Sequence, residues 1–218
     1  MPRITLVCSA HRENGLCNVP ELLRILQTLE PEVAFLERQP SGVAPDWSLE
    51  SKAIAKYSES TAIRRVIVEQ EEAPASLYPE MEMVWDCVEQ TSEEYVSLGE
   101  GHHLRAHRYG FEYLNTDVFA ATEARLSEIE DSIIRRMRDQ RLIRALERWR
   151  LIHQRREQDM VCNIYEYSRQ HVFGTGVFLV GAVHKPGVVK AIGQYSGPDA
   201  GSIGWAFAYD DARSLGTT

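Results

Sequence analysis

Residues 176–183, with the sequence Gly-Val-Phe-Leu-Val-Gly-Ala-Val, decide the fold more than any other stretch of this 218-residue chain. They are apolar on both faces, without the polar alternation of a half-exposed strand, which is typical of a central strand in a parallel sheet. His184 follows at once, and Lys185-Pro186-Gly187 leads into a short predicted helix over 188–194. We therefore expect a parallel sheet with this strand in its interior.

The N-terminal residues predict a βαβ unit that would supply two more strands of that sheet. Residues 4–8 (Ile-Thr-Leu-Val-Cys) and 33–36 (Val-Ala-Phe-Leu) are short apolar strands. Between them, leucines recur at helical spacing after Asn18 and Pro20, which suit a helix N-terminus. A strand, helix and strand in this order are typical of a right-handed crossover.

The middle of the chain is predicted to be mostly helical. Helices are expected over 46–57, 79–98 and 102–109, with strands over 66–68 and 111–114. Residues 118–170 contain no proline or glycine, and their apolar residues recur every three or four positions. A single helix of that length would span about 75 Å, so at least one break is expected.

These elements predict a three-layer α/β fold with a mainly parallel central sheet, flanking helices and a long helical excursion. We expect one α/β domain over 1–195, with its helical segment at 118–170. The tail over 196–218 is rich in Gly, Ser and Asp and is predicted to be loop.

Composition limits the class of protein. The chain is 44% hydrophobic and 26% charged, which are ordinary globular values. It has no apolar run near the ~20 residues of a membrane span and no signal-peptide pattern. Its four cysteines are far apart in sequence, without a CxxC pair, and are interpreted as reduced thiols. We expect a cytoplasmic protein that does not interact with membranes.

Charge is distributed unevenly along the chain. The net charge of −8 argues against general nucleic-acid binding. Residues 69–100 hold ten acids and no Lys or Arg, whereas 135–156 hold nine arginines and two acids. We expect these two segments to complement each other, within one chain or across a homodimer. The alternatives are two solvated faces, or an interaction module that uses the arginines.

Polar residues follow three of the predicted strands. His11, Glu37 and His184 come after the first, second and last strands, and ligands of parallel α/β sheets bind where strands end at their carboxyl edge. Two imidazoles and a carboxylate could ligate a divalent metal ion. They could equally act as a His/Glu pair that activates water.

Other polar residues are candidates for this pocket or for a separate site. Arg156 could hold an anionic group with its guanidinium fork, or belong to the basic helix face. Asp117 closes the strand predicted over 111–114 and could join the pocket, or cap a helix. His103 and His107 lie one helical turn apart but lack the glutamate of an HExxH motif, so they are interpreted as surface or capping residues.

Several short motifs resemble the TraB/Tiki/ChaN/erythromycin-esterase-like superfamily. Residues 181–188 (Gly-Ala-Val-His-Lys-Pro-Gly-Val) look like its C-terminal GxxH-x-x-G signature. Residues 156–164 are similar to the helix with an Arg-Asn-x-x-Met-Ala pattern that precedes that strand. Residues 8–11 (Cys-Ser-Ala-His) and 35–37 (Phe-Leu-Glu) agree in order with its first GxxH and its strand-terminal glutamate.

The resemblance covers residues 4 to about 193, with three departures. Cys8 stands where the family has glycine, Gln39 where it has the second acid of an ExE pair, and Glu157 where it has asparagine. The resemblance implies a hydrolase-like pocket. Tiki-type members are metal-dependent peptidases, erythromycin-esterase-type members are metal-independent His/Glu hydrolases, and ChaN-type members bind haem.

The leading hypothesis is a hydrolase that cleaves an ester or amide in a small-molecule or peptide substrate, with or without a divalent metal ion. His11 and His184 would be metal ligands or general bases, and Glu37 a ligand or base. The alternatives are a non-catalytic ligand-binding protein that keeps the fold, and an interaction module acting through the arginine-rich segment.

Overall fold

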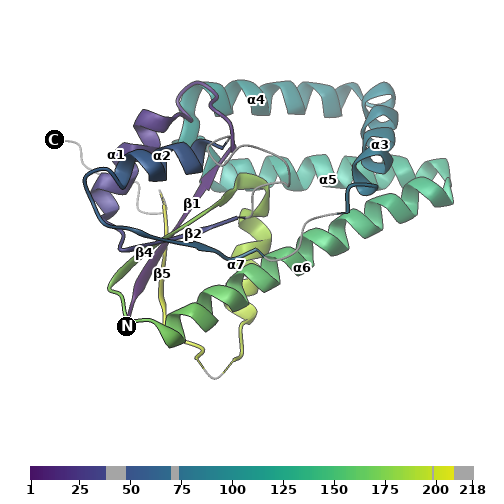
Figure 1. Ribbon diagram of the computed structural model, residues 1–218. Coiled ribbons are helices and arrows are strands. Elements are labelled where there is room, and N and C mark those ends of the chain that lie inside the picture. Colours follow the sequence, from purple (N-terminus) through teal and green to yellow (C-terminus); the bar gives the residue numbers. More distant parts are fainter. Residues whose placement is uncertain (38–47, 70–73, 198, 209–218) are drawn as a thin grey trace.

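A five-stranded parallel sheet organises the computed structural model (Figure 1), as the sequence predicts. The structure describes residues 1–37, 48–69, 74–197 and 199–208, so Gln39 lies outside the described residues. In sheet order the strands are β3 (Arg64–Ile67), β2 (Val33–Leu36), β4 (Thr175–Gly181), β1 (Arg3–Ser9) and β5 (Gly204–Phe207). The strands predicted at 4–8, 33–36 and 176–183 are therefore parallel neighbours, with β4 in the middle.

The register of the sheet brings three strand ends together. Ser9, the last residue of β1, lies opposite Gly181, the last residue of β4. Leu36 at the end of β2 lies opposite Leu179, two residues before the end of β4. Residues that follow β1, β2 and β4 therefore emerge at the same edge of the sheet.

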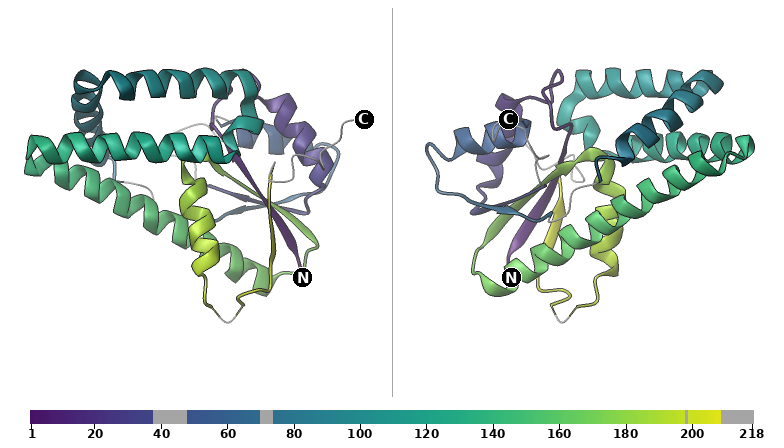
Figure 2. Two further views of the ribbon diagram at one scale, coloured as in Figure 1. Left: turned by 180° about the vertical axis from the view of Figure 1, so that it is seen from behind. Right: turned by 45° about the vertical axis from the view of Figure 1, so that its right-hand side comes forward.

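Helices cover both faces of the sheet (Figures 1 and 2). The chain leaves β1 toward β2 but leaves β4 toward β5, which lies on the opposite side. Because such crossovers are right-handed, α1 (Val19–Leu29) and α2 (Leu49–Tyr57) lie on one face. α7 (Lys185–Gln194) and the C-terminal half of α6 (Gln140–Gln170) lie on the other. The fold is the predicted three-layer α/β arrangement.

Helices α3 (Leu77–Thr91), α4 (Glu93–Leu114), α5 (Asp117–Met137) and the first half of α6 form an arm that extends away from the sheet (Figure 2). The arm has its own apolar core, in which residues such as Met81 of α3, Ile133 of α5 and Leu146 of α6 are buried. Among the described residues, no helix combines the length and apolarity that crossing a membrane requires.

The expected break within 118–170 occurs between α5 and α6. Arg138 adopts a left-handed conformation (φ 58°), and the Asp139 side chain then caps α6 by accepting from the backbone N–H of Arg141 at 2.8 Å. Because a capping carboxylate satisfies the free N–H groups of a helix start, the two residues make an efficient corner. The helical prediction for this segment is confirmed.

The acidic and arginine-rich segments contact each other within one chain, as predicted. α3 packs on α6 through the core of the arm, and Arg148 Nη1 lies 3.8 Å from Glu80 Oε2. Other arginines of α6 pair with acids outside the acidic segment. Arg150 Nη1, for example, lies 2.7 Å from Asp131 Oδ1 on α5. Exposed ion pairs contribute little to stability, so apolar packing holds α3 on α6.

Two predictions about the region before residue 118 are wrong. The helix expected over 79–98 is interrupted at Ser92, whose hydroxyl caps α4 by accepting from the backbone N–H of Tyr95 at 3.1 Å. The strand expected over 111–114 is the end of α4, which bends at Gly110 (φ 52°, ψ −130°). The four residues Phe-Glu-Tyr-Leu fit either structure, and here they form helix, with Phe111, Tyr113 and Leu114 buried in the core.

The tail prediction also needs correction, because residues 204–207 form β5 at the edge of the sheet. β5 pairs with β1 from Arg3↔Gly204 to Leu6↔Phe207. Its sequence, Gly-Trp-Ala-Phe, is short and only half-buried, so it carries little strand signal of its own. It forms because the second edge of the buried strand β1 needs hydrogen-bond partners. The α/β domain therefore extends past residue 195.

Candidate functional site

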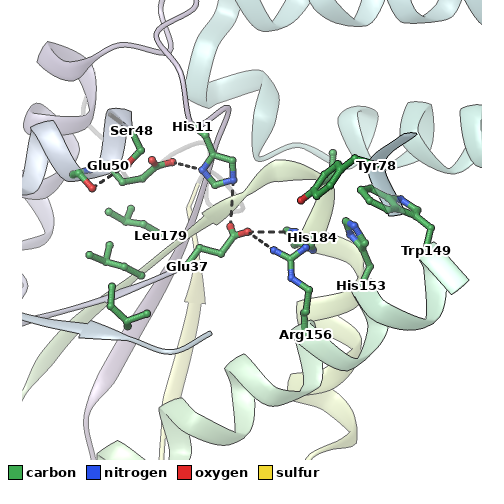
Figure 3. Close-up of a pocket in the computed structure, with 14 residues that line it drawn as sticks. His11, Glu37, Ser48, Glu50, Tyr78, Trp149, His153, Arg156, Leu179 and His184 are labelled. Atoms are coloured by element: carbon green, nitrogen blue, oxygen red, sulfur yellow. Dashed lines mark hydrogen bonds and ion pairs between the residues drawn. The ribbon is translucent and has the colours of Figure 1, made fainter. Parts of the chain in front are cut away.

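A cavity of about 250 Å³ opens at the carboxyl edge of the sheet, beside the adjacent ends of β1 and β4. The chain leaves these two strands toward opposite sides of the sheet, which creates the crevice where α/β proteins bind ligands. Polar and charged residues line one part of the cavity (Figure 3), namely His11, Glu37, Glu50, His153, Arg156 and His184. Aromatic and aliphatic residues line the rest, namely Tyr78, Trp149, Leu36, Ile67, Leu179 and Val183.

His11 is held by the start of α2. Its backbone adopts a left-handed conformation (φ 58°), which is uncommon for a residue with a side chain. Its carbonyl accepts from the backbone N–H of Leu49 at 2.8 Å, and its Nδ1 lies 3.0 Å from Glu50 Oε1. Ser9 Oγ donates to the same Glu50 oxygen. Because Ser48 caps α2, the Glu50 carboxylate also lies in the favourable first turn of that helix.

Glu37 lies at the centre of the site, directly after β2 (Figure 3). Its Oε2 lies 3.3 Å from His11 Nε2 and accepts from the backbone N–H of Gly181 at 2.7 Å. Its Oε1 lies 3.4 Å from His184 Nε2 and accepts from Arg156 Nη2 at 3.3 Å. One carboxylate therefore bridges two imidazoles that come from different strand ends.

His184 and Arg156 are anchored by further acids. His184 is 3% exposed, and its Nδ1 lies 3.0 Å from Glu157 Oε1 on α6. Arg156 Nε donates to the carboxylate of Glu69, which follows β3. The buried charges are thus arranged in opposite-sign contacts, which offsets the cost of removing them from water.

Two glycines in the stretch Gly181–Gly187 leave room for side chains of the site. A Cβ built on Gly181 would lie 2.5 Å from His11 Nε2. A Cβ on Gly187 would overlap the carboxylate of Glu157. The spacing of glycine, histidine and glycine in this motif therefore reflects close approach of His11 and Glu157 to the chain that carries His184.

The carboxylates keep the histidines charged. Burial disfavours the charged form of His11, but contacts with Glu37 and Glu50 outweigh burial and raise its pKa to about 10. Burial acts in the same way on His184, and Glu157 and Glu37 raise its pKa to about 9. Burial would raise the pKa of Glu37, yet its hydrogen bonds to both imidazoles bring it well below the usual value.

His11, Glu37 and His184 converge at the carboxyl edge of the sheet, as their places after three strands indicate, since both imidazoles lie within 3.4 Å of the Glu37 carboxylate. Arg156 also lines the cavity, as expected for its pocket role. Asp117 does not reach it: this residue is exposed in the first turn of α5, after the capping residue Thr116. The helix-capping alternative for this segment is the one the structure supports.

Sequence reasoning missed Glu50, Glu69, His153 and the aromatic pair Tyr78 and Trp149, all of which lie at the site. Glu50 has the appearance of an ordinary first-turn acid. His153 and Glu157 are four apart on a helix, which places them on one face and was a usable signal. Nothing local in the sequence indicates that this face meets His184.

The described residues include one set of three that fits a metal ion, namely His153, Glu157 and His184, whose donor atoms all lie within 4.8 Å of one another. The ligand set expected from the sequence shares only His184 with it. His11 and His184 face different oxygens of Glu37, so a single ion would not replace both contacts.

Comparisons with protein-family models, with curated proteins and with solved structures find no match for this chain. A function is therefore inferred from the contacts of the pocket.

Proposed function

We propose that the pocket hydrolyses an ester or amide bond in a small molecule or peptide, through His11 and Glu37. The observation that carries this proposal is the Glu37 carboxylate held between two imidazoles at the carboxyl ends of three parallel strands. Residues 181–188 also resemble the GxxH-x-x-G signature of the superfamily that includes the erythromycin-esterase-type His/Glu hydrolases, which supports the same proposal.

His11 is the imidazole that a substrate can reach. Its side chain is 34% exposed, whereas that of His184 is 4% exposed. Because its pKa is raised to about 10, His11 is an imidazolium at neutral pH. It can therefore stabilise negative charge on a carbonyl oxygen and supply a proton to a leaving group.

The proposed proton transfers return His11 and Glu37 to their starting protonation states. Glu37 accepts a proton from water as the water oxygen attacks the carbonyl carbon. His11 Nε2 gives its proton to the leaving oxygen or nitrogen and recovers one from Glu37. The 3.3 Å contact between His11 Nε2 and Glu37 is long for a charge-assisted hydrogen bond, so a substrate atom can replace Glu37 as acceptor at small cost.

Positioning falls to the other charged groups. Glu50 holds the second nitrogen of His11, while His184 and Arg156 hold the Glu37 carboxylate. The cavity wall formed by Tyr78 and Trp149 is aromatic, and a volume of about 250 Å³ is below that of a typical drug-sized site. These features favour a small substrate, or one end of a peptide, with an apolar group beside the reacting bond.

The test is turnover of chromogenic substrates, 4-nitrophenyl acetate for esters and a peptide 4-nitroanilide for amides. Glu37→Gln and His11→Gln should each lower kcat/KM by about 10²–10⁴-fold. The exposed His103 provides the matched control, because His103→Gln changes the same residue type outside the cavity. Equal rates for the Glu37 variant and the wild type would refute the proposal. Absence of turnover with both substrates would also refute it, and would favour a non-catalytic binding protein.

A further inference from the structure

His153 presents a buried nitrogen to the site without a partner. Its ring lies between two others on the cavity wall (Figure 3), with ring-centre distances of 4.2 Å to Trp149 and 4.9 Å to His184. Within the described part of the chain its Nε2 has no hydrogen-bond partner, although water cannot reach that atom in this structure. Buried polar atoms are almost always satisfied, so this nitrogen points to a ligand.

The neighbours of His153 are metal-ligand types at suitable distances. Glu157 lies one turn later on α6, and His184 ends the short 3-10 turn after β4. His184 Nδ1 and Glu157 Oε1 are 3.0 Å apart, and the three donor atoms lie within 4.8 Å of one another. Ligands placed tetrahedrally at about 2.1 Å from Zn²⁺ are about 3.4 Å apart, so small side-chain movements would close the set.

The surroundings provide the outer contacts that metal sites use. The other nitrogen of His184, Nε2, lies 3.4 Å from Glu37 Oε1, as in the carboxylate–histidine–metal arrangement that orients a ligating imidazole. Gly187 leaves room for the Glu157 carboxylate, which a Cβ at that position would displace. The ring of His153 lies at 42° to that of Trp149 and stacks on that of His184 at 20°, so both neighbours restrict its orientation.

We propose that His153, Glu157 and His184 bind one divalent transition-metal ion, with Zn²⁺ as the reference ion. The ion takes the place of the proton between His184 Nδ1 and Glu157 Oε1, which is released to solvent on binding. Two imidazoles and one carboxylate are a ligand set for zinc with a fourth position left for water. The site is distinct from the His11–Glu37 pair and does not depend on the hydrolase proposal, because binding requires no substrate.

The experiment measures Zn²⁺ binding to chelator-treated full-length protein by isothermal titration calorimetry, with bound metal counted by mass spectrometry after dialysis. The wild type should bind one ion per chain. His153→Gln should weaken binding at least about tenfold, because even the loss of an outer contact to a zinc ligand costs 10–100-fold. His171, exposed at the end of α6, provides the matched control, and His171→Gln should bind as the wild type does.

Two further variants separate this site from its alternatives. Glu157→Gln tests the carboxylate ligand and provides a second readout if the His153 variant fails to fold, as judged by circular dichroism. His11→Gln should keep the ion. Loss of zinc in His11→Gln with retention in His153→Gln would overturn the proposal, and so would substoichiometric binding by the wild type. Because no substrate is present, neither outcome bears on hydrolysis by His11 and Glu37.

Discussion

Replacing Gly181 with alanine should show whether this glycine is needed to leave room for the His11 ring or for its backbone flexibility. Its backbone angles, φ −58° and ψ 136°, are open to any amino acid, so alanine introduces no backbone strain. The new Cβ would lie 2.5 Å from His11 Nε2. An ordinary carbon–nitrogen contact is about 3.4 Å, so the ring must retreat by about 1 Å and leave hydrogen-bond range of Glu37.

The cost follows from that displaced contact. A hydrogen bond to a charged group contributes about 1.5–3 kcal/mol, whereas a compatible Gly→Ala change gains about 0.4–1 kcal/mol by restricting the unfolded chain. We expect a net loss of about 1–2 kcal/mol in the free energy of unfolding. For a chain of this size, that corresponds to a melting temperature lowered by about 2–8 °C.

Urea and thermal unfolding should be measured for Gly181→Ala alone and combined with His11→Ala. Without the His11 ring there is nothing to displace, so in that background Gly181→Ala should be neutral or slightly stabilising. Gly193→Ala in α7, where a Cβ meets nothing within 4 Å, should stabilise the protein by up to about 1 kcal/mol. An equal loss of stability from Gly181→Ala with and without His11 would refute the reasoning.

The remaining predictions concern pH and two structural residues. His11, whose pKa rises from 6.5 to about 10 on folding, stabilises the protein fully below pH 6.5, and this contribution is lost as pH rises toward 10. His11→Gln should therefore flatten the alkaline fall of the urea midpoint, and an unchanged slope would contradict this assignment. Glu50, whose pKa is lowered, acts in the opposite direction, so stability should also fall below about pH 4.5. Gly110→Ala should destabilise the protein by more than about 1 kcal/mol, because φ is 52° and a Cβ would overlap the backbone of Leu16. Gly99→Ala should not destabilise it, because a Cβ there meets nothing within 4 Å. Asn115→Ala should lower the unfolding free energy by about 2–4 kcal/mol, because the Asn115 amide hydrogen-bonds both the N–H and the carbonyl of Cys8 in β1. A loss under about 1 kcal/mol would show that water replaces the amide as their partner.

The part of the candidate site that lies at the strand ends was predictable from the sequence. His11, Glu37 and His184 each follow an apolar strand, and parallel strands end at one edge, so their convergence follows from the pattern. Their partners were not predictable in the same way. Glu50 and His153 lie on helices, and a helix pattern shows which residues share a face but not which strand end that face meets.

What the sequence determined by itself was the set of buried strands, their parallel direction and the long helical segment. These follow from local apolar periodicity, which reports burial directly. What only the tertiary structure decided was the pairing of β5 with β1, the helical state of residues 111–114 and the contacts that charge His11. Each of these depends on atoms far apart in the chain: a free strand edge, a core that accepts aromatic side chains, and carboxylates brought within 3.4 Å of an imidazole. Local patterns carry no distance information of that kind, so the chemistry of the pocket emerges only when the layers are packed together.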